Sequence, residues 1–238
     1  MEGRAQSTMP AFSAEPATAQ PDDRDLVHAA KDGDLAAFET LVMRHEQRIY
    51  GLARRLTGSE PDAQDVTQQT FLSAIKNLAG FQEKAAFSTW LTTIAANAAL
   101  KVIRKRRGMP TTSLDEATEP DDDGHIPHPE YIADWRESPD RLAQRADTRQ
   151  LLDAAIAGLD PGHRAVFLLR DVEDLPVRDT ALALGISEAN VKVRLLRARL
   201  HLRERLTRIF GDDGRRYEPD HHSHGTRPLK PLREKAHD

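Results

Sequence analysis

Apolar residues recur at every third or fourth position along most of the chain, which is the spacing of one face of an α-helix. The pattern is clearest between residues 188 and 208, where its members are Val191, Leu195, Ala198, Leu202 and Leu206. We therefore expect a long helix there with one buried stripe. Ser187 stands directly before it, where a side-chain oxygen can cap the first turn.

A shorter helix is predicted immediately upstream. Pro176 has a backbone φ suited to a first helical turn, an apolar side is supplied by Ala181, Leu182 and Leu184, and Gly185 ends the segment. Two helices joined by a glycine turn are typical of the helix-turn-helix unit, which places its second helix in the major groove of DNA.

The same spacing predicts helices over residues 25–56, with a break at Gly33, and over residues 61–78, 87–107 and 142–159. Asp160 and Pro161 mark the start of a further helix. We expect an all-α fold with two small helical domains, joined by a flexible linker and flanked by tails. The helical domains are residues 25–107 and 141–210, the linker is 108–140, and the disordered N-terminal tail and polar C-terminal tail are 1–24 and 211–238.

Charge is distributed unevenly along the chain. Residues 188–208 carry seven basic and two acidic side chains, a net +5, although the whole chain is formally −4. A basic helix on an acidic chain suggests a phosphate-backbone partner, and the helix-turn-helix favours this over a solvated surface helix.

Residues 115–140 have ten acidic residues and one arginine, a net −9. They predict a solvated linker rather than a cation site, because the spacing and turn glycine of a calcium loop are missing.

Composition excludes several classes of protein. The 238 residues contain no cysteine, which excludes disulfide frameworks, thiolate metal sites and thiol redox switches. No apolar run approaches the length of a membrane span and no secretion signal is recognisable, so we expect no membrane insertion and a cytoplasmic protein. His221, His222 and His224 could bind Zn or Ni weakly, but an unstructured tail is the stronger interpretation. We expect neither a resident metal nor a cofactor.

Four motifs in a fixed order accompany the helix-turn-helix. They are GDLAAFETLVMRH (Gly33 to His45), DAQDVTQQTF (Asp62 to Phe71), FSTWLTTIAAN (Phe87 to Asn97) and VFLLRDVEDL (Val166 to Leu175). Together they resemble the extracytoplasmic-function (ECF) group of sigma-70 type bacterial transcription initiation factors. The resemblance implies a non-catalytic protein, with helical regions 2 and 4, that binds core RNA polymerase and gives it promoter specificity.

The resemblance assigns roles to residues of the first domain. The DAQDVTQQTF helix is similar to the one that docks on core polymerase, and its outward contacts would be Asp62, Asp65, Gln68 and Gln69. The helix from Phe87 and the loop before it are similar to the part that captures the −10 promoter strand as flipped bases. The implied −10 contacts are Phe81, Gln82 and Lys84 in the loop, and Asn97, Lys101, Arg104, Arg106 and Arg107 on the helix. Trp90 lies on the apolar stripe and is interpreted as core rather than as a stacking platform.

The helix from Ser187 resembles the reader of the −35 element. Its expected DNA contacts are Lys192 and Arg197 to bases or phosphates, Arg194 and Arg199 to the backbone, and Val193 and Leu196 to thymine methyl groups. Packing against the preceding helix explains Val193 and Leu196 equally well. The linker in this family enters the polymerase cleft, where its negative charge can mimic nucleic acid.

Two other functions remain as alternatives. A stand-alone helix-turn-helix regulator would bind duplex DNA without polymerase, but it leaves the block from Asp62 to Asn97 unexplained. An enzyme could use Asp62 and Asp65 for acid-base chemistry, but no partner base, nucleophile or phosphate loop accompanies them. The resemblance also implies an anti-sigma protein as a partner, since members of this family are typically silenced by one.

Overall fold

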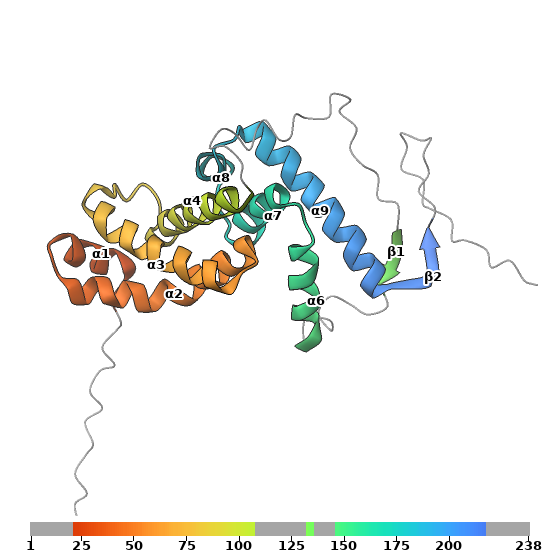
Figure 1. Ribbon diagram of the computed structural model, residues 1–238, viewed down its shortest axis with the longest axis horizontal. Helices are drawn as coiled ribbons and strands as arrows, with labels where there is room; N and C mark the ends of the chain where they lie inside the picture. Colours follow the sequence, from red (N-terminus) through yellow and green to blue (C-terminus); the bar gives the residue numbers. More distant parts are fainter. Residues whose placement is uncertain (1–20, 108–131, 136–145, 218–238) are drawn as a thin grey trace, which may run out of the picture.

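The computed structural model describes residues 21–107, 132–135 and 146–217 (Figure 1). A 3-10 turn spans Leu78–Gly80, and a π-helical turn spans Leu168–Val172. The elements are α1 (Asp23–Lys31), α2 (Leu35–Thr57), α3 (Glu60–Asn77), α4 (Phe87–Arg107), β1 (Ile132–Trp135), α6 (Ala146–Ala157), α7 (Pro161–Phe167), α8 (Val177–Leu184), α9 (Glu188–Phe210) and β2 (Gly211–Tyr217).

The predicted helix boundaries are confirmed where a capping residue defines them. Gly58 and Gly185 adopt the left-handed conformation that ends α2 and α8, with φ of 69° and 67°. The Ser187 side chain accepts a hydrogen bond from the backbone N–H of Asn190, which caps α9. Asp160 caps α7 in the same way through Gly162. Helix α1 begins at Asp23, two residues before the predicted Asp25.

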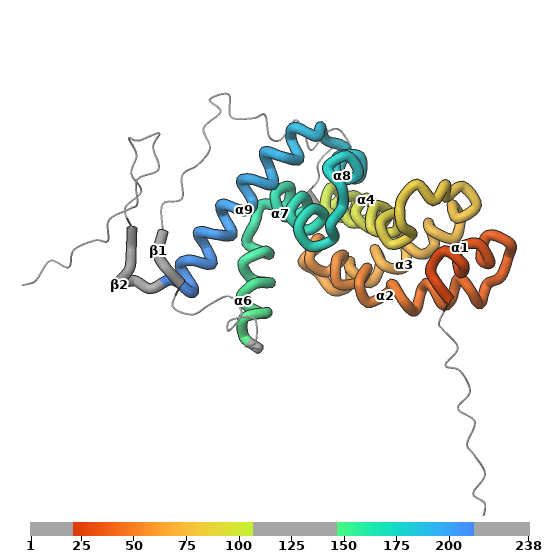
Figure 2. Tube along the Cα trace, turned by 180° about the vertical axis from the view of Figure 1, so that it is seen from behind, coloured from red at the N-terminus to blue at the C-terminus, as the bar shows by residue number. Residues whose placement is uncertain are grey.

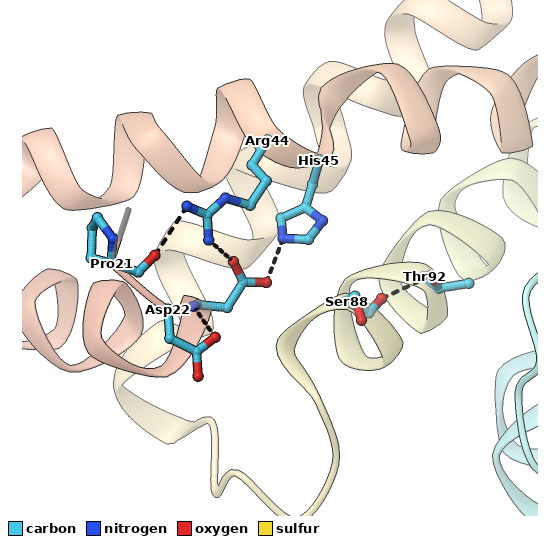
Figure 3. A network of polar contacts seen from close by, with 7 residues as sticks. Pro21, Asp22, Arg44, His45, Ser88 and Thr92 are labelled. Carbon is cyan, nitrogen blue, oxygen red and sulfur yellow. Dashed lines mark hydrogen bonds and ion pairs between the residues drawn. The ribbon is translucent and has the colours of Figure 1, made fainter. Parts of the chain in front are cut away.

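Helices α2, α3 and α4 pack against one another, and α1 lies against α2. Their shared core contains Leu41, Leu52 and Leu91, which are almost completely buried. The start of α1 is fixed to α2 by a polar network (Figure 3). In it, Arg44 and His45 contact the two carboxylate oxygens of Asp23, with His45 Nε2 2.8 Å from Oδ2. Burial raises the pKa of Asp23, but the hydrogen bonds from Arg44 and His45 outweigh this and hold it below its usual value.

Helices α7, α8 and α9 form the second group, with α6 packed on α9. The predicted stripe of α9 is confirmed for its first four members, since Val191, Leu195, Ala198 and Leu202 are buried, and Leu206 is half-buried. Arg194 was expected to lie off this stripe and is instead only 3% exposed. The reason is that α7 leaves room for it: a Cβ at Gly162 would lie 3.2 Å from Arg194 Nη1.

The all-helical expectation is confirmed for the two domains, and one pair of strands lies outside them. β1 pairs antiparallel with β2, with Ile132 opposite Tyr217 and Ala133 opposite Arg216. These strands lie in the segments interpreted as linker and C-terminal tail. The paired residues are more than 70 positions apart in the sequence, so the pairing produces no periodic pattern of apolar residues within either segment. The remaining predictions of a disordered N-terminal tail, an acidic linker and a His-containing tail concern residues 1–20, 108–131, 136–145 and 218–238, which lie outside the described residues.

The two helix groups contact each other (Figure 2), with α8 on α4 and α2 against α6 and α7. Their buried residues form a continuous apolar core. Polar contacts reinforce it: Arg48 Nη2 lies 2.7 Å from Glu173 Oε2, and Arg164 donates to the carbonyl of Leu56 at 3.1 Å. The Glu173 side chain is only 5% exposed. A buried carboxylate of this kind depends strongly on its cationic partner.

We expect Arg48→Met and Glu173→Gln to be coupled by about 1 kcal/mol in a double-mutant cycle, because each removes the same inter-group ion pair. The measurement is the free energy of unfolding of the full chain in urea. As a control, Arg55→Met combined with Glu173→Gln should be additive, since Arg55 contacts Asp153 instead. A coupling near zero for the first pair would contradict a stabilising role of this ion pair in the docking of the two helix groups.

Candidate nucleic-acid interface

A cavity of about 250 Å³ opens beside the loop that joins α3 to α4. This cavity is lined by all three loop residues that were expected to contact −10 DNA, which are Phe81, Gln82 and Lys84. The other polar lining residues, which sequence reasoning missed, are Glu83 in the loop, Thr89 and Thr93 on α4, and Asp179 on α8. The positions of the two threonines on the outer face of α4 could have indicated them. Leu182, which was expected on the apolar side of its helix, is exposed and lines the same cavity.

Aromatic side chains form one wall of this cavity. The rings of Phe81 and Trp90 are stacked with their centroids 4.7 Å apart, and Phe87 contacts both. Phe81 is 8% exposed, so it supports the wall more than it projects into solvent. Trp90 is half-buried and packs against the core as expected, yet it also lines the cavity. The loop therefore rests on a rigid apolar base.

A groove of about 600 Å³ runs between α3 and α4. Asp65 and Gln69 line its α3 side, and Asn97 and Lys101 line its α4 side. The structure thus brings residues expected to contact polymerase next to residues expected to contact DNA. Asn97 is exposed, and its Nδ2 donates to the carbonyl of Thr93 at 3.0 Å.

The basic end of α4 is partly neutralised by α3. Arg106 Nη1 lies 2.9 Å from Asp62 Oδ2, and its Nη2 donates to Ser59 Oγ. Asp62 is consequently 18% exposed at its side chain and less open than expected, whereas Asp65, Gln68 and Gln69 are exposed. Lys101 is exposed and Arg104 is half-buried, and the side chain of Arg107 lies outside the described residues.

The outer face of α9 begins with an exposed group. Lys192 is exposed, as are Val193 and Leu196 at 40% and 41%, which favours their DNA interpretation over packing. Arg197 is half-buried. Sequence reasoning did not include Glu188 and Ala189, which are exposed in the first turn of α9, among the candidate DNA contacts. Recognition helices contact base edges with their N-terminal residues, so the position of these two residues in the helix could have indicated them.

Two of the predicted −35 arginines have structural partners. Arg194 is buried against α7, as described above. Arg199 forms two hydrogen bonds with Asp171, at 2.8 Å and 2.7 Å, which raise the pKa of its guanidinium. Arg199 therefore ties α9 to the π-helical turn. Its side chain is still 57% exposed, so solvent weakens this pair.

A second surface cavity, of about 610 Å³, lies between α6, α7 and α9. His163 and His201 line it with stacked rings 6.1 Å apart. Burial lowers the pKa of His163, and the positive charges of His201 and Arg194 add to this, while Asp160 opposes it. Its Nε2 is buried without a hydrogen-bond partner among the described residues. Within those residues, no three His, Asp or Glu side chains are grouped as metal ligands.

Two protein-family models match the chain: "Sigma-70 region 2" matches residues 41–108 and "Sigma-70, region 4" matches residues 149–202. The ECF sigma factor SigM of Mycobacterium tuberculosis is 33% identical over 189 residues, which cover 79% of this chain and 85% of the relative. The chain belongs to the ECF sigma factors. As a sigma factor, the protein is not an enzyme, and it directs promoter-specific initiation of transcription by RNA polymerase.

Other relatives agree with this family. The RNA polymerase sigma-H factor of Pseudomonas aeruginosa is 32% identical over 180 residues, covering 76% of this chain and 91% of its own. Among solved structures, CnrH in complex with the cytosolic domain of CnrY has a TM-score of 0.51 at 26% identity, covering 78% of this chain and 97% of CnrH. Because both helix groups are matched, the sigma factor is more than a helix-turn-helix regulator. None of its described helices is long and apolar enough to cross a lipid bilayer.

We expect this sigma factor to lose stability as the pH falls below about 6.5, the ordinary histidine value. Since the folded state lowers the pKa of His163, the unfolded chain takes up the proton first. The contribution of neutral His163 to the free energy of unfolding is fully present above the pKa of this histidine in the unfolded chain, and it is lost as the pH falls below that value. His163→Phe should show a smaller fall in Tm between pH 8 and pH 5.5 than wild type. An equal fall in both would show that another group causes it.

Proposed function

We propose that the α3–α4 groove and loop 81–86 form one continuous interface on which this sigma factor meets both core polymerase and the −10 strand. The observation that carries the proposal is the cavity beside the loop, which collects Gln82, Lys84 and the two threonines of α4. Its volume of about 250 Å³ is smaller than the pockets of drug-sized ligands, about 300–1,000 Å³. A single flipped base is a ligand of suitable size and chemistry.

Helix α4 continues the −10 interface beyond the cavity. Thr93, Asn97 and Lys101 follow one another at four-residue steps and so form one row on the helix. The Asn97 amide is suited to a base edge, and Lys101 and Arg104 to the following phosphates. Arg106, whose side chain is 55% exposed, can join them when it separates from Asp62.

Core polymerase binds the exposed face of α3. Asp65, Gln68 and Gln69 present carboxylate and amide groups there, and Asp62 adds a charge that is shared with Arg106. These groups suit a basic docking surface, where charge complementarity sets partner choice and association rate.

The −35 element is read by the first turns of α9. Lys192, Val193, Leu196 and Arg197 form the contact group, while Arg194 and Arg199 hold the helix in place through α7 and Asp171. In the contact group, the apolar side chains contact thymine methyl groups and the basic side chains contact phosphates.

The wider assignments follow from the family. Residues 25–107 and 141–210 act as the two domains, residues 108–140 link them through the polymerase cleft, and the protein works in the cytoplasm. CnrH is seen with the cytosolic domain of CnrY. A comparable anti-sigma protein would cover the polymerase-binding face of this chain, and its co-purification from the native host tests that partner.

The proposal is tested by in vitro transcription with core polymerase and a promoter library randomised at both elements. Asn97→Ala should weaken −10 selection and Arg197→Ala should weaken −35 selection, each by about tenfold, because a good base contact is worth about 1–3 kcal/mol. Loss of transcription without a change in selection would contradict these contacts.

Matched controls are available on the same helices or in the same domain. Arg203→Ala changes an exposed arginine further along α9, and Gln47→Ala changes an exposed amide on α2. Both should leave the selected sequences unchanged. Equal effects of Arg197→Ala and Arg203→Ala would mean that α9 contributes only general positive charge.

A further inference from the structure

Loop 81–86 has empty space on both sides. The cavity of about 250 Å³ borders one side, and a second cavity of about 260 Å³ borders the side that faces the start of α1. Phe81, Glu83 and Ala85 line both cavities. Close packing therefore does not by itself determine where the loop lies, and the loop depends more on polar contacts for its position.

Those polar contacts come from α1, some 50 residues away in sequence. Lys31 Nζ donates to Glu83 Oε1 at 2.6 Å and to the backbone carbonyl of Phe81 at 2.8 Å. The same ammonium group lies 5.5 Å from the centroid of the Phe81 ring. His28 Nε2 lies 3.0 Å from the other carboxylate oxygen of Glu83. One lysine thus connects the beginning of the loop with its middle.

The contact between Lys31 and Glu83 has the features of a contact that positions the loop. Lys31 and Glu83 are 22% and 28% exposed at their side chains, so water competes with the pair less than at an open surface. The hydrogen bonds from Lys31 and then His28 lower the pKa of Glu83, which keeps the carboxylate charged. His28 is 61% exposed and so is the weaker of its two partners.

Glu83 also has an unusual backbone. Its φ is +54°, in the left-handed region that side chains with a Cβ rarely adopt. Such a conformation persists when surrounding contacts hold it, and here those contacts are Lys31 and His28. Gln82 and Lys84 are the immediate neighbours of Glu83, so its backbone conformation sets the directions in which their side chains leave the chain.

Helix α1 is itself fixed at its other end. Asp23 in its first turn contacts Arg44 and His45 of α2, and these two partners are labelled in Figure 3. The lysine at the last residue of α1 therefore reaches the loop from a support attached to the helical core. A movement of the loop has to break the Lys31 contacts, because α1 cannot follow it freely.

We propose that Lys31 and Glu83 are specificity-determining positioning residues, which hold loop 81–86 in the conformation that selects the −10 sequence. Lys31 acts through the loop and does not touch DNA. The inference rests on the proposed role of the loop in −10 binding and adds to it a determinant outside the matched region 2, which begins at residue 41.

The test uses holoenzyme made with the full chain and a promoter library randomised separately at the −10 and −35 elements. Lys31→Met and Glu83→Gln should each reduce discrimination at one or more −10 positions by about 5–10-fold, while −35 discrimination and affinity for core polymerase change less than twofold. Lys31→Arg should retain most of the discrimination, since it keeps a cation of similar reach. Lys76→Met, a change of an exposed lysine at the end of α3, is the matched control and should have no effect.

The charge-reversed double variant Lys31→Glu with Glu83→Lys should recover part of the discrimination lost in either single reversal. It cannot recover all of it, because the bond to the Phe81 carbonyl needs a donor at position 31. Recovery would separate a specific contact from a general loss of positive charge.

The outcomes distinguish this inference from the proposed function. Gln82→Ala is measured alongside and tests the loop directly. If Gln82→Ala lowers −10 discrimination and Lys31→Met does not, the positioning role is wrong and the loop's DNA role stands. If Gln82→Ala is also without effect, both are wrong. Parallel loss of −10 selection, −35 selection and core affinity in Lys31→Met would identify a purely structural contact and also overturn the inference.

Discussion

The packing of α4 is the constraint on which the other features depend. Leu91, Ala95 and Ala99 are completely buried, and small alanines let neighbouring helices approach closely. Helices α2 and α3 pack against α4 within the first group, and α8 contacts it from the second. Because neighbouring helices fix its buried side, the opposite row that contains Asn97 and Lys101 is held in one orientation. The proposed −10 surface gains preorganisation in this way at little cost in side-chain entropy.

Basic residues of this sigma factor fall into two groups. Arg194 and Arg199 are held by protein partners, one buried against α7 and one bonded to Asp171, whereas Lys101 and Lys192 are exposed. A guanidinium that is already hydrogen-bonded twice gains less from a phosphate, because the first partner must be given up. The basic charge of α9 therefore exceeds the charge available for DNA, and part of it stabilises the domain.

Local signals allowed much of the helical fold to be predicted. Gly58, Gly185 and Ser187 act through the backbone of their own turn, so their effect is visible in the sequence. Contacts between distant segments were not visible in this way. The burial of Arg194 depends on the missing side chain of Gly162, and the pairing of β1 with β2 depends on a strand far along the chain. Sequence patterns identified the loop before α4, but the lysine that holds it belongs to another helix.

The contact between the two helix groups also affects the candidate base cavity. Asp179 and Leu182 of α8 form part of its lining, so the position of α8 limits what the cavity admits. Displacing α8 costs the free energy of the apolar contacts between the groups and of the Arg48–Glu173 pair. Every 1.4 kcal/mol of that cost lowers the affinity of any ligand that needs the displacement by about tenfold. Under the proposed role of the cavity, the interface between the helix groups is an energetic term in promoter binding as well as a determinant of stability.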